Sequence, residues 1–242
     1  METFSAVNSF ENFKSEVSRR SRYLRSANGD QFLRAVAETS KRRLREIPKA
    51  TVFWRAQIGH DWVVNSKVGT RTRGPHSTSR MKPLEDRAYE GRVNPKGIPC
   101  LYFATTREVA MSEVRPWIGS VVSVGRFRTD RKLNVVDCSV YHDEAIPLVE
   151  TPSVEVIEQI VWTHIDQAFA RPVTRSDNTA EYAATQVLAE VFRLAGYDGI
   201  IYKSAFAAEG YNVALFDLNG AHQIDSSIFT VRNAVYAFAE ID

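Results

Sequence analysis

Six short runs rich in β-branched and aromatic residues follow Pro48, and segments with helical periodicity separate several of them. The runs have the length and composition of strands. They are residues 51–57, 100–104, 120–127, 133–137, 198–204 and 212–218. Short strands scattered among helices are typical of an α+β domain. We therefore predict one α+β domain over residues 50–242.

The segment before this domain, residues 1–49, has the pattern of two helices. Asn8 or Ser9 can cap the first helix, and the dipeptide Asn28-Gly29 predicts the turn that ends it. Asp30 can cap the second helix, whose apolar residues recur near helical spacing until Pro48. We expect an N-terminal helical segment ahead of the α+β domain.

Three further helices are predicted within the α+β domain. Thr105 and Glu108 match a capping box for a short helix that ends before Pro116. Thr151 can begin a second helix, with a proline at its first helical position. The third covers residues 178–195, where alanine, valine and leucine form one stripe.

Composition excludes several classes of protein. The chain is 44% hydrophobic and 25% charged, which is ordinary for a globular protein. No apolar run is long enough to span a membrane and the first residues are too polar for a secretion signal, so we expect a cytoplasmic protein with no membrane partner. Cys100 and Cys138 lie far apart without further ligands at metal-binding spacing, which predicts reduced thiols and no metal site.

Residues 65–97 are dense in Ser, Thr, Arg, Gly and Pro and poor in apolar side chains. A long polar segment inside a compact domain is usually either functional or mobile. Arg92 stands near its end, in a turn-rich stretch around Asn94 that can point backbone amides and a guanidinium at one anion. Most such stretches are merely turns.

Glu113 is the least expected residue of the chain. At helical spacing it falls one turn after Val109 and Ala110, on the face that should be apolar. A carboxylate there is costly to bury unless it is paired, so it belongs either to a structural ion pair or to a functional site. Ser204 lies on a strand face with apolar neighbours, where a serine is usually just a small hydrogen-bonding residue. The residues alone leave both readings of Glu113 open.

Arg55 and Tyr102 lie on predicted strands. An arginine in a strand is more often a salt-bridged edge residue than an anion clamp, although its rigid fork suits phosphate. Tyr102 shares its strand face with Ala104, which leaves room for a flat ring to stack on the phenol. Ordinary core packing is the default reading of such a tyrosine.

Taken in order, these residues belong to a longer pattern. It comprises WRA at 54–56, EGRVNPKGIPCLYFA at 90–104, VAMSEV at 109–114, GYDGIIYKSA at 196–205 and NVALF at 212–216. The pattern resembles the RES domain, which is named for an Arg, a Glu and a Ser and is found in bacterial toxins of toxin–antitoxin pairs. The resemblance covers about residues 50–220.

The resemblance implies a fold similar to that of ADP-ribosyltransferase toxins, with NAD as substrate. NAD is split into nicotinamide and an ADP-ribose product, by hydrolysis or by phosphorolysis with inorganic phosphate as co-substrate, and its depletion stops growth. The catalytic residues implied are Arg55, Glu113 and Ser204, and the substrate-binding residues are Arg92, Tyr102, Asn94, Tyr202 and Asn212. A cognate antitoxin protein is the expected partner, and the oligomeric state stays open, a homo-oligomer included.

Two alternatives remain. An ADP-ribosyltransferase would use the same site to modify a macromolecule. A non-enzymatic nucleic-acid-binding module would use the basic run formed by Lys41, Arg42, Arg43 and Arg45. We interpret that run instead as a solvated helix face, because Glu and Ser interrupt it.

Overall fold

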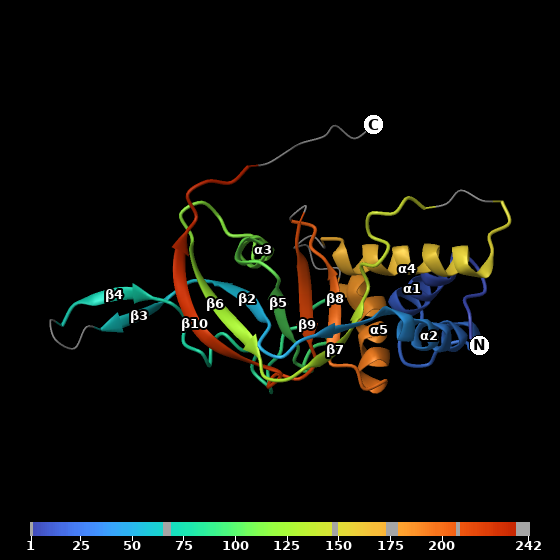
Figure 1. Cartoon of the computed structure of the whole chain (residues 1–242), viewed down its shortest axis with the longest axis horizontal. Helices are drawn as coiled ribbons and strands as arrows, with labels where there is room; N and C mark the ends of the chain where they lie inside the picture. The colour runs from blue at the N-terminus through green and yellow to red at the C-terminus, as the bar shows by residue number, and fades with distance from the viewer. Residues whose placement is uncertain (1, 65–68, 147–149, 173–178, 207–208, 236–242) are drawn as a thin grey trace.

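An eight-stranded mixed sheet runs through the middle of the protein in the computed structural model, which describes residues 2–64, 69–146, 150–172, 179–206 and 209–235 (Figure 1). The strand order is β1-β7-β8-β9-β5-β2-β6-β10, and every pair is antiparallel except β7 with β8. The strands are β1 (Leu44–Ile47), β2 (Val52–Ile58), β5 (Leu101–Ala104), β6 (Val121–Thr129), β7 (Leu133–Asp137), β8 (Gly199–Lys203), β9 (Tyr211–Leu215) and β10 (Ala221–Thr230). The predicted α+β class and all six predicted strands are confirmed.

Four helices gather at one end of the sheet, and a fifth stands alone above its middle (Figure 1). The group comprises α1 (Ser9–Arg19), α2 (Ala27–Ser40), α4 (Val154–Ala170) and α5 (Ala183–Leu194), and the single helix is α3 (Arg107–Glu113). Trp162 of α4 is fully buried within the group, and its indole N–H donates to Thr39 Oγ1 over 3.0 Å. The N-terminal helices therefore share one core with the later helices and with β7 and β8.

The N-terminal helices differ from the prediction at their junction. Asn28 and Gly29 do not form a turn but lie inside α2, because Ser26 caps this helix by accepting from Gly29 N over 3.2 Å. Glu16 in turn accepts from Ser26 N and Oγ. A Cβ on Gly29 would lie 2.9 Å from Glu16 Oε2, so a larger residue here would displace the Glu16 side chain that holds Ser26.

The basic run does not form a solvated helix face, so that interpretation is wrong. Residues 41–43 form the 3₁₀-helix η1 (Lys41–Arg43), and the chain then enters β1, which pairs with β7. Arg43 is buried between the rings of Tyr141 and Trp162, with its guanidinium carbon 4.5 and 4.3 Å from their centres. The other three cations pair with carboxylates, as Lys41 with Glu38, Arg42 with Glu158 and Arg45 with Asp137. Arg43 therefore belongs to the core, whereas Lys41, Arg42 and Arg45 form ion pairs from exposed positions.

Two predicted caps are displaced by one or two residues. Thr106, not Thr105, caps α3 by accepting from Val109 N over 3.2 Å. Thr105 instead accepts from Tyr211 N over 3.0 Å and ties the start of β9 to the end of β5. Ser153 caps α4 in place of Thr151. Residue 178, the predicted start of the third helix, lies outside the described residues, and that segment resumes as the 3₁₀-helix η2 (Thr179–Tyr182) before α5.

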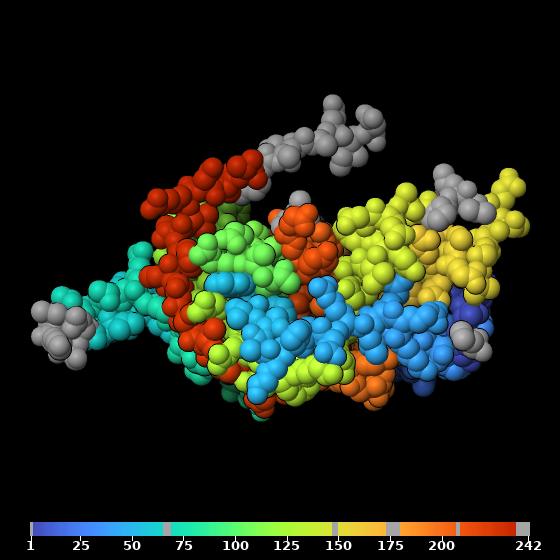
Figure 2. Space-filling view, in the orientation of Figure 1, coloured from blue at the N-terminus to red at the C-terminus, as the bar shows by residue number. Residues whose placement is uncertain are grey.

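A hairpin that the sequence did not predict leads into the polar segment, and its second strand lies within that segment. Strands β3 (Asp61–Val64) and β4 (Arg71–Gly74) form a separate two-stranded sheet and project from the body (Figures 1 and 2). The remainder of the segment returns beneath the sheet, where the fully buried Met81 packs against Phe53 and Phe103. This segment thus covers the sheet face opposite α3.

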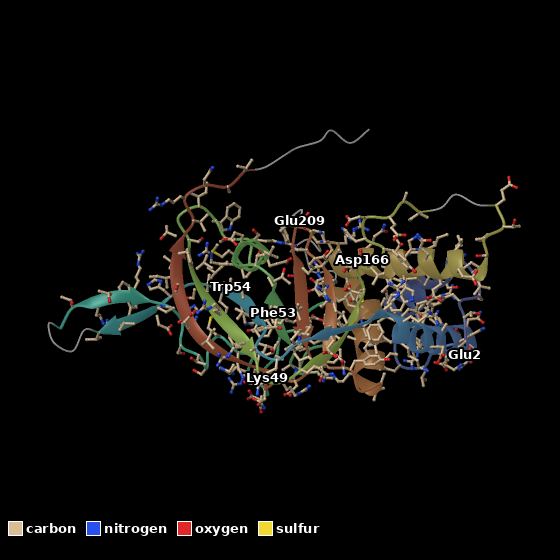
Figure 3. All side chains as sticks on the ribbon, in the orientation of Figure 1. Glu2, Lys49, Phe53, Trp54, Asp166 and Glu209 are labelled. Atoms are coloured by element: carbon tan, nitrogen blue, oxygen red, sulfur yellow. The ribbon has the colours of Figure 1, made fainter. Side chains whose placement is uncertain are left out.

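Strands β2 and β5 are neighbours in the sheet but pair through one residue of each strand only. Strand β2 pairs with β6 along its whole length, but with β5 only through Trp54 and Ala104. No other residues of these two strands are paired, and Trp54, labelled in Figure 3, marks the position of the single contact. Backbone groups and side chains of β2 and β5 past the contact therefore face a gap in the sheet.

Candidate functional site

A cleft of about 720 Å³ opens where β2 and β5 diverge. Its walls come from β2, β5, the end of α3, η2, β8 and β9. Six of the eight predicted site residues line it, namely Arg55, Arg92, Tyr102, Glu113, Tyr202 and Asn212. The volume lies in the range of small-molecule binding sites.

Glu113 ends α3 and points its carboxylate at β8 and β9. Its Oε1 atom accepts hydrogen bonds from Ser204 Oγ over 2.8 Å and from Asn212 Nδ2 over 2.6 Å. Val109 and Ala110 bury the apolar side of the same helix, which fixes the direction of Glu113. Among the described residues Glu113 forms no ion pair, so the structural ion-pair reading has no support there.

Ser204 and Asn212 are the donors that orient this carboxylate. Both are buried, at 3% and 6% exposure, and both are neutral. Ser204 follows the last residue of β8 and Asn212 is the second residue of β9, so the pairing of these two strands brings them together. Neutral donors fix the carboxylate without cancelling its charge. Ser204 does not line the cleft itself but stands behind Glu113.

Arg55 lies on β2 with its guanidinium at the gap between the strands. Its Nη1 atom donates to the backbone oxygen of Tyr102 over 3.0 Å, whereas its Nε atom is buried without a partner. Burial lowers the pKa of Arg55 to about 10, which leaves it cationic at neutral pH. No ion pair to a carboxylate is seen for it in the part of the chain that the structure describes. A desolvated and uncompensated cation suits an incoming anion.

Arg92 and Tyr202 meet at the wall nearest α4. The Nη1 atom of Arg92 donates to the backbone oxygen of Phe169, the next-to-last residue of α4. Tyr202 is buried on β8, and its ring centre lies 5.7 Å from that of Phe169. Burial raises the pKa of Tyr202 above its ordinary value, so its hydroxyl stays protonated. The cleft therefore has a cation and a phenol side by side on this wall.

Tyr102 and Asn94 form a hydrogen-bonded unit. The Tyr102 hydroxyl donates to Asn94 Oδ1 over 2.6 Å and accepts from Val93 N over 3.0 Å. The Asn94 amide donates to three backbone oxygens of its own loop, those of Tyr89, Pro95 and Ile98. Asn94 is buried and does not line the cleft, so its visible contacts hold the loop and the Tyr102 ring in place.

Several residues of the cleft were not predicted as site residues, and the largest polar or aromatic side chains among them include Trp54, Tyr182 and Arg115. Trp54 was visible within the WRA motif, but nothing in the sequence marks Tyr182, which reaches the cleft from η2. Arg115 adopts a left-handed backbone conformation, with φ of 46°, which costs free energy for a non-glycine residue. The guanidinium of Arg115 lies 5.1 Å from the ring centre of Phe206.

The remaining chemistry of the described residues is sparse. Cys100 and Cys138 are free and buried, and burial raises the pKa of both thiols, that of Cys100 to about 12. In the described ranges no cluster of His, Cys, Asp and Glu could hold a metal ion. No described helix is both long and apolar enough to cross a membrane.

Comparison with known proteins gives one family and one solved structure. The model of the RES domain matches residues 52–232. The crystal structure of the toxin–antitoxin complex MbcT–MbcA from M. tuberculosis is 14% identical, with a TM-score of 0.43, and the match covers 81% of this chain and 92% of that chain. No curated protein sequence matches.

Proposed function

The chain belongs to the RES domain family, and from this premise we propose that it consumes NAD by cleaving the bond between nicotinamide and ribose. The observation that carries the proposal is the carboxylate of Glu113, held by two neutral donors at the edge of a cleft that also presents arginine side chains. A dinucleotide with a cationic nicotinamide and an anionic pyrophosphate complements that arrangement of charge.

Glu113 acts on the sugar. Breaking the bond between nicotinamide nitrogen and ribose C1′ leaves the electron pair on the nitrogen and builds positive charge on the ribose. A fixed carboxylate stabilises that charge and accepts hydrogen bonds from the ribose hydroxyls. Ser204 and Asn212 are positioning residues, because they hold Oε1 of Glu113 and leave the rest of the carboxylate available.

Arginine side chains bind the pyrophosphate. Its negative charge meets Arg55, which pairs with no described carboxylate, and Arg92, whose guanidinium donates to a backbone oxygen. Tyr102 and Tyr202 offer ring faces to the nicotinamide, a contact that contributes about 0.5–1.5 kcal/mol between aromatic rings. Because the Tyr102 hydroxyl is tied to Asn94, its ring is held in one orientation before substrate arrives.

The acceptor completes the reaction. An oxygen of water or of inorganic phosphate bonds to ribose C1′ and loses a proton, which gives ADP-ribose or its 1-phosphate beside neutral nicotinamide. An enzyme that consumes NAD in the cytoplasm harms its own cell, so we also propose that the chain is a toxin restrained by an antitoxin protein.

The test is product analysis after incubation of the purified chain with NAD, with and without inorganic phosphate. Nicotinamide and an ADP-ribose product are expected, and the phosphate dependence identifies the acceptor. NAD labelled in its adenylate part separates the transferase alternative, because a transferase leaves the label on a macromolecule. A folded sample that releases no nicotinamide under either condition would refute the proposed reaction.

A further inference from the structure

A polar network at its base ties the projecting β3–β4 hairpin to the body (Figures 1 and 2). Asp61, the first residue of β3, accepts from Ser77 N over 2.9 Å, and its Oδ1 atom lies 2.9 Å from Nδ1 of His76. His76 is buried, and its backbone N–H donates to Ser123 Oγ of β6 over 3.0 Å. These contacts fix the base of the hairpin, so the described parts of its strands leave the sheet in one direction.

One face of this hairpin carries exposed side chains that the fold does not use. The register pairs Trp62 with Arg73 and Val64 with Arg71. The four side chains share a face, because opposite residues of an antiparallel pair, and alternate residues of one strand, point the same way. Trp62 is 57% and Val64 is 53% exposed, and neither belongs to a hydrophobic core cluster. Because tryptophan and arginine are enriched at protein interfaces, this face has the composition of a docking surface.

The positive charge of the same face is not compensated within the described part of the chain. Arg71 and Arg73 are exposed, and no ion pair to a carboxylate is seen there for either side chain. Asp61, the one acidic residue of the two strands, lies on the opposite face and is held at the base. Two neighbouring cations without a carboxylate between them favour an acidic occupant.

The outer edges of the hairpin are open to a further strand. Strands β3 and β4 form a sheet of two strands, and in the described ranges their backbone groups bond to no backbone outside the hairpin. An extended segment can add to such an edge through main-chain hydrogen bonds. Alternate side chains of a strand are about 7 Å apart, so acidic residues at every second position of an added strand match the spacing of Arg71 and Arg73.

We propose that the hairpin is the docking site of a protein partner, which adds an extended segment with acidic residues at alternate positions beside β4. Its carboxylates pair with Arg71 and Arg73, and Trp62 supplies apolar contact area on the same face. This interaction is independent of NAD cleavage, because none of the three side chains lines the cleft.

Two other occupants fit the hairpin less well. A second copy of this chain that pairs its own β4 with this β4, arginines on one face, sets like charges against each other. Pairing through β3 leaves the arginines uncompensated. Nucleic acid offers phosphates to the arginines but no alternating donors and acceptors to the open strand edge, and its binding draws on more phosphate contacts than two arginines provide.

The experiment uses three labelled synthetic peptides of equal length, measured by fluorescence anisotropy at low salt because exposed charge pairs are screened at high ionic strength. One alternates glutamate with threonine, the second has the same composition with its glutamates in one block, and the third alternates lysine with threonine. The full chain should bind the alternating glutamate peptide at least about tenfold more tightly than the other two.

A charge reversal tests the role of the arginines. The double variant Arg71→Glu/Arg73→Glu should lose the alternating glutamate peptide and gain the lysine peptide, a gain that misfolding cannot produce. Arg19→Glu/Arg20→Glu is the matched control, because it changes the net charge equally at exposed positions of the N-terminal segment, and it should bind as the wild-type chain does.

The tryptophan is tested separately. Trp62→Ala should weaken binding of the alternating glutamate peptide about three- to tenfold, since an interface tryptophan contributes a large share of contact energy. Trp117→Ala is the control, because Trp117 is also exposed but lies outside the hairpin, and it should leave the affinity unchanged.

Four results would overturn the proposal. They are absent binding of the alternating glutamate peptide, equal binding of the two glutamate peptides, tighter binding of an oligonucleotide that the double variant loses, and a dimer of the free chain in sedimentation that Trp62→Ala dissociates. The third assigns the face to nucleic acid and the fourth to a second copy. Each of them leaves the test of NAD cleavage untouched, since that test follows nicotinamide release.

Discussion

Ser204 Oγ lies 2.8 Å from Glu113 Oε1, although 91 positions separate the two residues in the chain. The contact joins the end of β8 to the end of α3, and Asn212 donates to the same oxygen. One carboxylate oxygen thus receives two hydrogen bonds from neutral groups. In the proposed reaction Glu113 acts on the substrate, whereas Ser204 and Asn212 hold its carboxylate.

Replacing Glu113 with glutamine should remove most of the activity. The amide keeps the shape but carries no charge toward the ribose, so kcat for nicotinamide release should fall about 10²- to 10³-fold. Glu108→Gln is the matched control, since Glu108 lies on the same helix, is exposed and pairs with Arg107. Equal activity of the two variants, measured on samples with the same circular dichroism spectrum, contradicts the role of Glu113.

Ser204→Ala tests positioning rather than charge. Glu113 keeps the bond from Asn212 but loses one of its two constraints, so kcat should fall about tenfold, in line with loss of one catalytic orientation. KM for NAD and the affinity for ADP-ribose should stay within about twofold, because Ser204 does not line the cleft. A loss of ADP-ribose affinity equal to the loss of kcat would point to a purely structural role.

The sequence predicts the strands well because their signal is local. Alternation along residues 51–57 and 100–104 puts Phe53 and Phe103 on one face and Trp54 and Ala104 on the other, as the structure has them. The hydrogen bonds around Glu113 are not local. They depend on β8 pairing with β9 and on α3 ending beside both, which no spacing along the chain encodes.

The errors have physical causes of the same kind. Asn28-Gly29 is a good turn signal, but the Ser26 cap, which Glu16 holds through two hydrogen bonds, places both residues inside α2. Residues 44–47 have helical periodicity, yet pairing with β7 outweighs the weak preference of a four-residue segment. Tyr182 enters the cleft through tertiary packing alone, and its surrounding sequence carries no motif.

The N-terminal helices should be required for folding. Phe32 is 5% exposed and its ring stacks on Phe13 with centres 4.6 Å apart, within the core that also contains Trp162. Phe32→Ala should lower the free energy of unfolding by about 3–5 kcal/mol, measured by urea denaturation. The exposed Tyr23→Ala is the control and should change it by less than about 0.5 kcal/mol. A negligible effect of Phe32→Ala would mean that this layer is detachable from the fold.

The two thiols should be inert in the native protein. Burial raises the pKa of Cys100 to about 12 and that of Cys138 as well, so neither forms a thiolate near pH 8. Ellman's reagent should therefore react only after denaturation. In the unfolded chain the thiols ionise near the ordinary cysteine pKa of 9.0, whereas the folded chain keeps them protonated. The contribution of the Cys100 thiol to the free energy of unfolding should thus be fully present below pH 9 and decrease as the pH rises from 9 toward 12. Rapid labelling of the native chain at pH 8 would contradict the buried state.

Replacing Arg55 with an uncharged residue should stabilise the folded chain and weaken its binding of the substrate. The guanidinium of Arg55 is desolvated, and its Nε atom lacks a partner. In the described part of the chain no ion pair offsets the free-energy cost of this desolvation, so removal of the charge should stabilise the folded state. Arg55→Met, which keeps much of the volume, should raise the free energy of unfolding by about 1 kcal/mol in the absence of ligand. The same variant should lose the increase in Tm that ADP-ribose gives the wild-type chain, because the pyrophosphate loses its central cation. Arg45→Met is the control, since Arg45 is exposed and pairs with Asp137 at the surface, and it should keep the full response to ADP-ribose. A less stable Arg55→Met chain that still responds to ADP-ribose would assign Arg55 to the structure of the sheet rather than to the ligand.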